Sequence, residues 1–205
     1  MLKLLFAPTS PFVRKVMVCA HLTGQAGNIQ LLDSAAHPVR RDARIAVHNP
    51  LAKVPTLILQ DGQALYDSRV ICEYLSSQAD AGTIFPASGA DRWKALSRQA
   101  LGDGLLDAAL LARYELTARP PEFQWPTWRE ALLTKVTACL ASIEAIASDL
   151  AHDKPTIGEI TIGCALGYLD FRYANEPWRP GHPKLEAWYA KVVKLPPLAE
   201  TMPVG

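Results

Sequence analysis

The sequence has neither a long apolar run nor a surplus of one charge. Its 205 residues carry a formal net charge of +1, so no global electrostatic field recruits nucleic acid or an acidic membrane. No uninterrupted run of about 18 apolar residues predicts a membrane-spanning helix. The apolar opening, Leu2 to Ala7, is too short for the core of a signal peptide. We therefore expect a cytoplasmic protein.

Cysteine is scarce and dispersed along the chain. Cys19, Cys72, Cys139 and Cys164 form no Cys-x-x-Cys pair and no cluster with histidine at metal-ligand spacing. In the cytoplasm such isolated cysteines are reduced and pack as small apolar side chains. The sequence thus predicts no metal site and no redox chemistry of its own.

The first 77 residues combine strand and helix patterns. Short apolar segments predict strands at residues 2–6, 29–32, 55–59 and 64–66. Apolar residues at helical spacing predict helices at residues 11–22 and 67–75. Asp61-Gly62 predicts a hairpin turn between the last two strands, whereas residues 33–49 have no convincing period. This part of the chain is therefore expected to form an α/β domain.

The remainder of the chain predicts helices alone. Residues 78–90 are rich in Gly, Pro, Ser and Ala, as linkers are. Helical patterns follow at residues 91–117, 127–150, 156–173 and 182–195. The third is largely apolar, which is typical of a central helix. We predict an α/β domain at 1–78, a linker at 79–89 and an all-helical domain at 90–205.

Four segments, taken in order, resemble the cytosolic glutathione S-transferase family. They are Ser10-Pro11-Phe12 after a short strand, NPLAKVPTL from Asn49, DSRVICEYL from Asp67 and PTIGEI from Pro155. The resemblance covers essentially the whole chain and is closest to serine-type, bacterial-like members. It implies a thioredoxin-like domain that binds glutathione, followed by a helical bundle domain with a second-substrate pocket.

The chain departs from the family pattern at two positions. Ala52 stands where glycine is usual, which predicts a backbone either without positive φ or slightly strained. Glu159 stands where aspartate is usual, yet Thr156-x-x-Glu159 still suits a capping box at a helix start. Neither change touches the groups expected to carry chemistry.

Ser10-Pro11 has the form of a helix start, since serine is a preferred N-cap and proline suits the first helical position. A capping serine accepts hydrogen bonds through its lone pairs, and its hydroxyl proton stays free to donate to an anion. The resemblance implies that this anion is the glutathione thiolate and that Ser10 is catalytic. Thr9 is the alternative, because the match is uncertain by one residue.

The resemblance assigns further residues to glutathione. It places Phe12 in the site and implies a cis peptide between Val54 and Pro55, so that the Val54 backbone pairs with the cysteinyl part. Lys53 would neutralise the glycyl carboxylate. From the residues alone, Pro55 could simply begin a strand and Lys53 could be a solvated surface side chain.

Asp67 and Ser68 are implied to hold the γ-glutamyl end of glutathione. Asp67 would pair with its ammonium, and Ser68 would bind its carboxylate at a helix N-terminus, with assistance from Arg69. Capping of the following helix explains the same residues. In the helical domain, Tyr114 is the implied pocket-lining residue for the second substrate, and Arg113 beside it would favour an anionic substrate.

The resemblance implies a cytoplasmic homodimer that serves detoxification, with glutathione as co-substrate, a small electrophile as second substrate, and no metal, nucleic-acid or membrane partner. The expected reaction is conjugation or glutathione-assisted isomerisation. Two alternatives stay open: peroxidase chemistry, and a binding or adaptor protein that keeps the fold but does not use the site.

Overall fold

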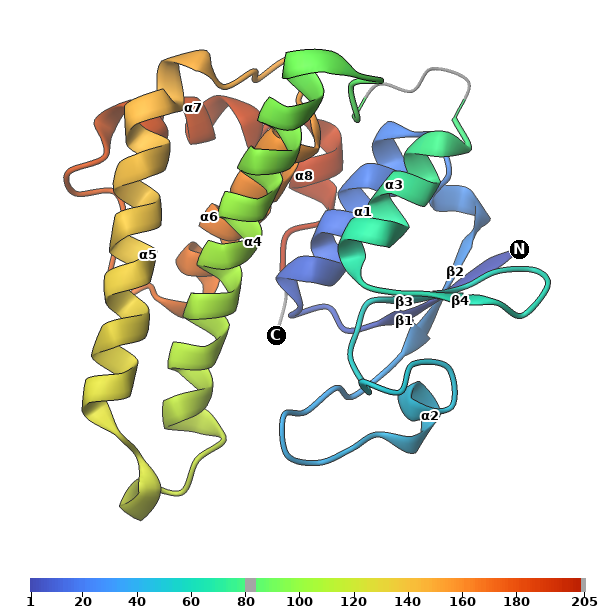
Figure 1. Cartoon of the computed structure of the whole chain (residues 1–205), viewed down its shortest axis with the longest axis horizontal. Coiled ribbons are helices and arrows are strands. Elements are labelled where there is room, and N and C mark those ends of the chain that lie inside the picture. Colours follow the sequence, from blue (N-terminus) through green and yellow to red (C-terminus); the bar gives the residue numbers. More distant parts are fainter. Residues whose placement is uncertain (80–83, 204–205) are drawn as a thin grey trace. The chain divides into compact units, whose positions relative to one another are not determined.

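The computed structural model describes residues 1–79 and 84–203 (Figure 1). The predicted linker lies partly outside these residues. The chain divides into two compact units, one formed by Met1–Arg92 with Pro196–Gly205 and the other by Trp93–Leu195. Strands occur only in the first within the described ranges, which confirms the predicted α/β part followed by a helical part.

The first unit is built on a four-stranded sheet in the order β2-β1-β3-β4. Its strands are β1 (Leu2–Phe6), β2 (Ile29–Asp33), β3 (Thr56–Ile58) and β4 (Ala64–Leu65). β1 runs parallel to β2, and β3 runs antiparallel to both β1 and β4. The four predicted strands are confirmed, and the hairpin turn has Gly62 at φ 89°.

Helices cover both faces of this sheet. On one side α1 (Pro11–Leu22) packs against α3 (Ser68–Ser77), and the two lie side by side in Figure 1. On the opposite face, Ile45 of the short helix α2 (Ala43–Ala46) packs with Leu5 and Ile58. Helix α2 was not predicted, because four residues are too few to show a helical period.

The last part of the chain returns to the first unit. Helix α8 (Pro196–Glu200) packs against α1, and the buried Arg14 donates from Nη2 to the carbonyl of Leu198 at 3.0 Å. The sequence predicted the preceding helix to end at the two prolines, 196 and 197, but gave no sign of this short one. Its place depends on a contact between residues far apart in the chain.

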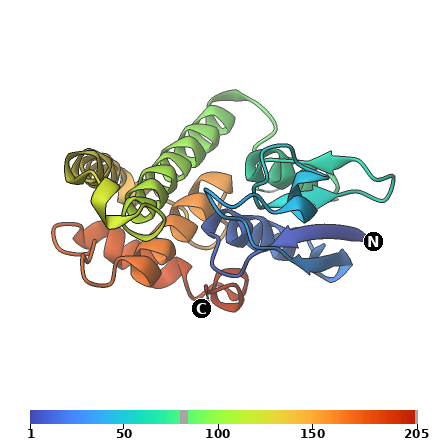
Figure 2. The ribbon, with the colours of Figure 1, turned by 90° about the horizontal axis from the view of Figure 1, so that it is seen from below.

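The second unit contains the long helices. They are α4 (Gly89–Thr117), α5 (Pro126–Ile146), α6 (Ile157–Arg172) and α7 (Pro183–Val192), with α4 beginning just before the unit's boundary. Short 3-10 turns lie at Pro121–Phe123 and Ala147–Asp149, and a third, Ala26–Asn28, lies in the first unit. Figures 1 and 2 show α4 and α5 side by side. The four predicted helices are confirmed.

Helix α6 is the centre of the second unit, since every residue from Ile157 to Leu169 is buried. Its close approach to α4 requires glycine. A Cβ added at Gly158 would lie 2.5 Å from Arg98 Cβ, and one at Gly102 would lie 2.9 Å from Thr161 Cγ2. Both distances are below normal contact, so larger residues at either position would push the two helices apart.

Helix α5 is long and strongly apolar. The 24 residues from Pro126 to Asp149 are long and apolar enough to cross a membrane by length and composition alone, a test that core helices of soluble proteins also pass. Its buried residues follow one face at helical spacing, namely Leu132, Val136, Leu140 and Ile143. A single buried face is what a helix packed on a protein core requires.

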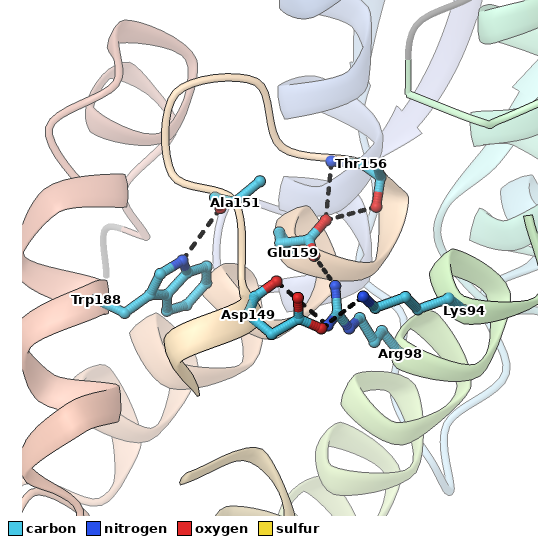
Figure 3. Close-up of polar contacts among 7 residues, drawn as sticks. All are labelled: Lys94, Arg98, Asp149, Ala151, Thr156, Glu159 and Trp188. Atoms are coloured by element: carbon cyan, nitrogen blue, oxygen red, sulfur yellow. Dashed lines mark hydrogen bonds and ion pairs between the residues drawn. The ribbon is translucent and has the colours of Figure 1, made fainter. Parts of the chain in front are cut away.

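A buried ion pair joins α4 to the start of α6 (Figure 3). Arg98 donates from Nη1 to Glu159 at 2.6 Å, and the Arg98 and Glu159 side chains are 10% and 1% exposed. The second Glu159 oxygen accepts from the Thr156 backbone N–H at 2.9 Å and from its hydroxyl, which confirms the predicted capping box. Arg98 Nη2 and Lys94 both contact the exposed Asp149 at 2.5 Å.

The hydrogen bond from Lys94 is the main reason why the pKa of Asp149 is below its usual range. Figure 3 also shows Trp188 of α7 donating to the carbonyl of Ala151 at 3.1 Å, just beyond Asp149. One charged network and one backbone contact thereby fix the segment between α5 and α6.

Ala52 adopts the left-handed backbone region, with φ at 52°. The other described residues with positive φ are glycines. Of the two predicted alternatives, the backbone without positive φ is therefore wrong, and the strained one is confirmed. A left-handed alanine costs about 1–2 kcal/mol relative to the right-handed form.

Replacing Arg98 with methionine is expected to lower the free energy of unfolding by about 3–5 kcal/mol, because Glu159 would stay buried without its charged partner. The urea midpoint measures this. The control is Lys94→Met, which should leave the midpoint nearly unchanged, since its partner Asp149 is exposed and surface ion pairs contribute little. Equal losses in both variants would contradict a dominant role for the buried pair.

Ala52→Gly is expected to raise the free energy of unfolding by up to about 1 kcal/mol. It removes the left-handed cost, and the greater freedom of glycine in the unfolded chain offsets only part of that gain. The matched control is Ala141→Gly on the exposed side of α5, which should lose about 0.5–1 kcal/mol. Destabilisation by both glycines would show that Ala52 is not strained.

Candidate functional site

Strand pairing in the first unit brings three loops to one edge of the sheet. Leu5 lies opposite Thr56, so the end of β1 lies beside the start of β3. Leu57 lies opposite Leu65, so the end of β4 reaches the same edge. The chain leaves β1 toward Ser10, enters β3 from Pro55 and leaves β4 toward Asp67. Three of the segments singled out in the sequence are thus assembled by the topology.

Ser10 is the N-cap of α1, as predicted. It has extended backbone angles, φ −83° and ψ 121°, and its Oγ accepts from the Val13 N–H at 3.3 Å, with Pro11 in the first helical position. Among described residues no acceptor takes the Ser10 hydroxyl proton, so that donor remains available. The first turn carries no acidic side chain, and its backbone N–H groups therefore favour an anion.

Thr9 lies in the turn just before the cap and is half-buried, as Ser10 is. Both hydroxyls are therefore near the helix N-terminus, and the choice between them stays a prediction. Phe12, one residue into the helix, is half-buried, and the buried Lys15 ammonium lies 5.8 Å from its ring centroid. Packing accounts for Phe12, whose assignment to the glutathione site also stays a prediction.

The loop before β3 is held by one buried amide. Asn49 Nδ2 donates to the Lys53 carbonyl at 3.2 Å and to Thr56 Oγ1 at 2.9 Å, and Thr56 Oγ1 donates to the same carbonyl at 2.9 Å. The Val54–Pro55 peptide is cis, which confirms the expectation from the family resemblance. Val54 is half-buried, whereas the Lys53 side chain is exposed.

Asp67 caps α3 in the same way that Ser10 caps α1. Its Oδ1 accepts from the Arg69 N–H at 2.9 Å, and Ser68 is the buried first residue of the helix. The Tyr66–Asp67 peptide is also cis. Asp67 is exposed, so its other carboxylate oxygen keeps acceptor capacity. The predicted cap is confirmed, and the exposed carboxylate stays accessible to solvent.

No described residue offers a reactive thiol or a metal site of its own. Cys19, Cys72 and Cys164 are buried. Cys139 is half-buried, and burial raises the pKa of its thiol, which opposes thiolate formation. Within residues 1–79 and 84–203, no three His, Cys, Asp or Glu side chains are placed to hold a metal.

Of the two residues predicted to bind the second substrate, only Arg113 lines a pocket in the structure. Arg113 lines a pocket of about 200 Å³ in the helical unit, and Tyr114 is not among that pocket's lining residues. Burial raises the pKa of the half-buried Tyr114. Arg129 and Arg172 line the same pocket and were missed. No spacing in the sequence links them, because they come from α5 and the end of α6.

Two family matches cover most of the chain. Residues 9–78 match the glutathione S-transferase N-terminal domain, and residues 126–191 match the glutathione S-transferase C-terminal domain. The first match contains the three loops at the sheet edge. The second contains α5, α6 and most of α7.

Individual relatives agree with these matches. The chain is 30% identical to the uncharacterized GST-like protein YibF of Escherichia coli K12, over 98% of each chain. A glutathione transferase family member from Pseudomonas fluorescens Pf-5, solved with bound glutathione, is 44% identical over the whole of both chains, with a TM-score of 0.97. The same organism's family member with bound S-(propanoic acid)-glutathione gives 43% and 0.92. This chain belongs to the glutathione S-transferase family.

Proposed function

We propose that this protein is a glutathione transferase that binds glutathione at the sheet edge of its first unit and activates the thiol for attack on a small electrophile. The observation that carries the proposal is the free hydroxyl of Ser10 at the N-terminus of α1, on the same edge as the cis Val54–Pro55 peptide and the Asp67 cap. A hydroxyl donor, a backbone peptide and a carboxylate would then all contact glutathione.

The chemical step needs the thiolate. An unperturbed thiol has a pKa of about 8.5, so only a few per cent is ionised at neutral pH. A hydroxyl donor and a helix N-terminus both favour the charged form, and each unit of lowered pKa corresponds to about 1.4 kcal/mol. The thiol proton passes to solvent, and the sulfur lone pair forms the bond to the electrophilic carbon. In a substitution the leaving group departs with its bonding pair; in an addition the π-bond pair moves away from that carbon and takes a proton from solvent. Ser10 donates throughout and is not consumed.

The remaining contacts orient glutathione. We assign the Val54 backbone to the cysteinyl part, Lys53 to the glycyl carboxylate, and Asp67 to the γ-glutamyl ammonium. Ser68, with Arg69 near it, would bind the γ-glutamyl carboxylate at the start of α3, where backbone N–H groups point outward. The Pseudomonas relatives support glutathione as the ligand, since one was solved with glutathione and the other with an S-substituted glutathione bound.

The wider setting rests on family membership. We propose a cytoplasmic homodimer that serves detoxification, with Arg113 and Tyr114 contributing to second-substrate binding. Conjugation is favoured over peroxidase or disulfide chemistry, because the half-buried Cys139 is the only described cysteine that is not buried and its thiol pKa is raised. The reacting sulfur in this proposal is therefore that of glutathione.

Calorimetry should detect glutathione binding with a dissociation constant in the millimolar range or tighter, about −4 kcal/mol or better. Asp67→Asn keeps the cap, since asparagine caps as well as aspartate, but removes the charge that pairs with the ammonium. Its affinity should fall about tenfold or more. The matched control is Asp61→Asn, whose carboxylate accepts from the Gln63 N–H at 2.9 Å in a similar turn. Absence of binding to the wild type would refute the proposal.

Ser10→Gly should raise the thiol pKa of bound glutathione by about one unit or more, because it removes the hydroxyl that donates to the thiolate. Absorbance of the thiolate against pH measures this without knowledge of the electrophile. Glycine replaces a cap at a cost of a few tenths of a kcal/mol, whereas Ser10→Ala costs about 1 kcal/mol.

We expect Ser10→Gly and Ser10→Ala to change the thiol pKa of bound glutathione equally but to differ in their free energy of unfolding. That result would separate the effect of Ser10 on the thiol from its effect as a helix cap. Thr9→Ala should leave the pKa of the bound thiol unchanged. A shift in Thr9→Ala alone would transfer the role to Thr9, and no shift in any variant would contradict thiolate stabilisation by either hydroxyl.

A further inference from the structure

The pocket in the helical unit is rich in arginine. Its volume of about 200 Å³ exceeds the roughly 150 Å³ of an engineered cavity that binds benzene, so it is large enough for a small organic molecule. The end of α4, the start of α5 and the segment that begins at the end of α6 form its walls. Polar side chains dominate its lining, among them Arg113, Thr117, Arg129, Arg172, Asn175 and Glu176.

Of the three arginines that line the pocket, only one pairs with a described carboxylate. Arg129 pairs with Glu176 at 2.6 Å, yet its Nε is buried without an acceptor. Arg113 and Arg172 form no ion pair with any carboxylate in the described part of the chain. The Arg172 guanidinium instead lies 3.8 Å from the Phe171 ring centroid. Two guanidinium groups therefore remain uncompensated in one small pocket.

Nearby tyrosines do not supply the missing negative charge. Burial raises the pKa of Tyr114, Tyr168 and Tyr173, so all three stay protonated and neutral near pH 7. The pKa of Arg172 is lowered, first by burial and then by the charge of Arg113, which shows that the two cations repel each other. A bound anion would relieve that repulsion.

We propose that this pocket binds the carboxylate of a small organic acid, with Arg113 and Arg172 as its charged ligands. A guanidinium presents planar paired donors that match a carboxylate. Thr117 and Asn175 add polar groups, and Leu116 provides an apolar wall for an organic stem, which free phosphate would not use. Glu176 also lines the pocket, and its carboxylate pairs with Arg129 at 2.6 Å.

The site lies wholly within the helical unit and needs no glutathione, so it can be tested apart from the proposed transferase function. Succinate serves as the probe, titrated by calorimetry into the full chain without glutathione. Binding should be saturable, and affinity should fall at least tenfold in Arg113→Gln and in Arg172→Gln. Arg172→Lys, which keeps the charge but loses the paired donors, should give an intermediate loss.

The control is Lys135→Gln, which removes one positive charge from the exposed side of α5 and should bind succinate as the wild type does. Thermal midpoints provide a second readout, since succinate should raise that of the wild type and of Lys135→Gln but not of the two arginine-to-glutamine variants. Absence of wild-type binding, an equal loss in Lys135→Gln, or tighter binding of phosphate than of succinate would overturn the proposal.

Discussion

The antiparallel pairing of β1 with β3 is the constraint on which the candidate site depends. Because Leu5 lies opposite Thr56, the loop that ends at Ser10 and the loop that contains Val54–Pro55 meet at one edge of the sheet. The pairing of β3 with β4 adds Asp67. A register shift of one residue would turn each strand's buried side chains outward, so core packing and site assembly are fixed by the same contacts.

Helix capping and ligand binding use the same groups in this unit. Ser10 and Asp67 each accept one backbone N–H through a side-chain oxygen, at the starts of α1 and α3. Each keeps a hydrogen-bonding group that the cap does not use. In Ser10 this is the hydroxyl proton, and in Asp67 it is the second carboxylate oxygen. The structural and functional interpretations of these residues are therefore compatible, and variants that keep the cap are needed to separate them.

The helical unit contains arginines in two environments, one buried and one half-buried. Arg98 meets Glu159 and Asp149, and the network ties α4 to the start of α6. Arg113 and Arg172 meet no described carboxylate and line a pocket instead. A neutralised cation contributes to the fold, whereas an uncompensated one at a cavity is a cost that a ligand can offset. This contrast is the physical reason for assigning the second pair to binding.

The sequence by itself determined the elements and the family. Periodicity and turn residues predicted the strands, the long helices and both caps, and the order of four motifs identified the glutathione S-transferases. Tertiary structure decided what local patterns do not encode. It set α8 against α1 and gave Ala52 its positive φ. It also brought Arg113, Arg129 and Arg172 into one pocket. Such contacts join residues whose separation along the chain follows no period, so only packing determines them.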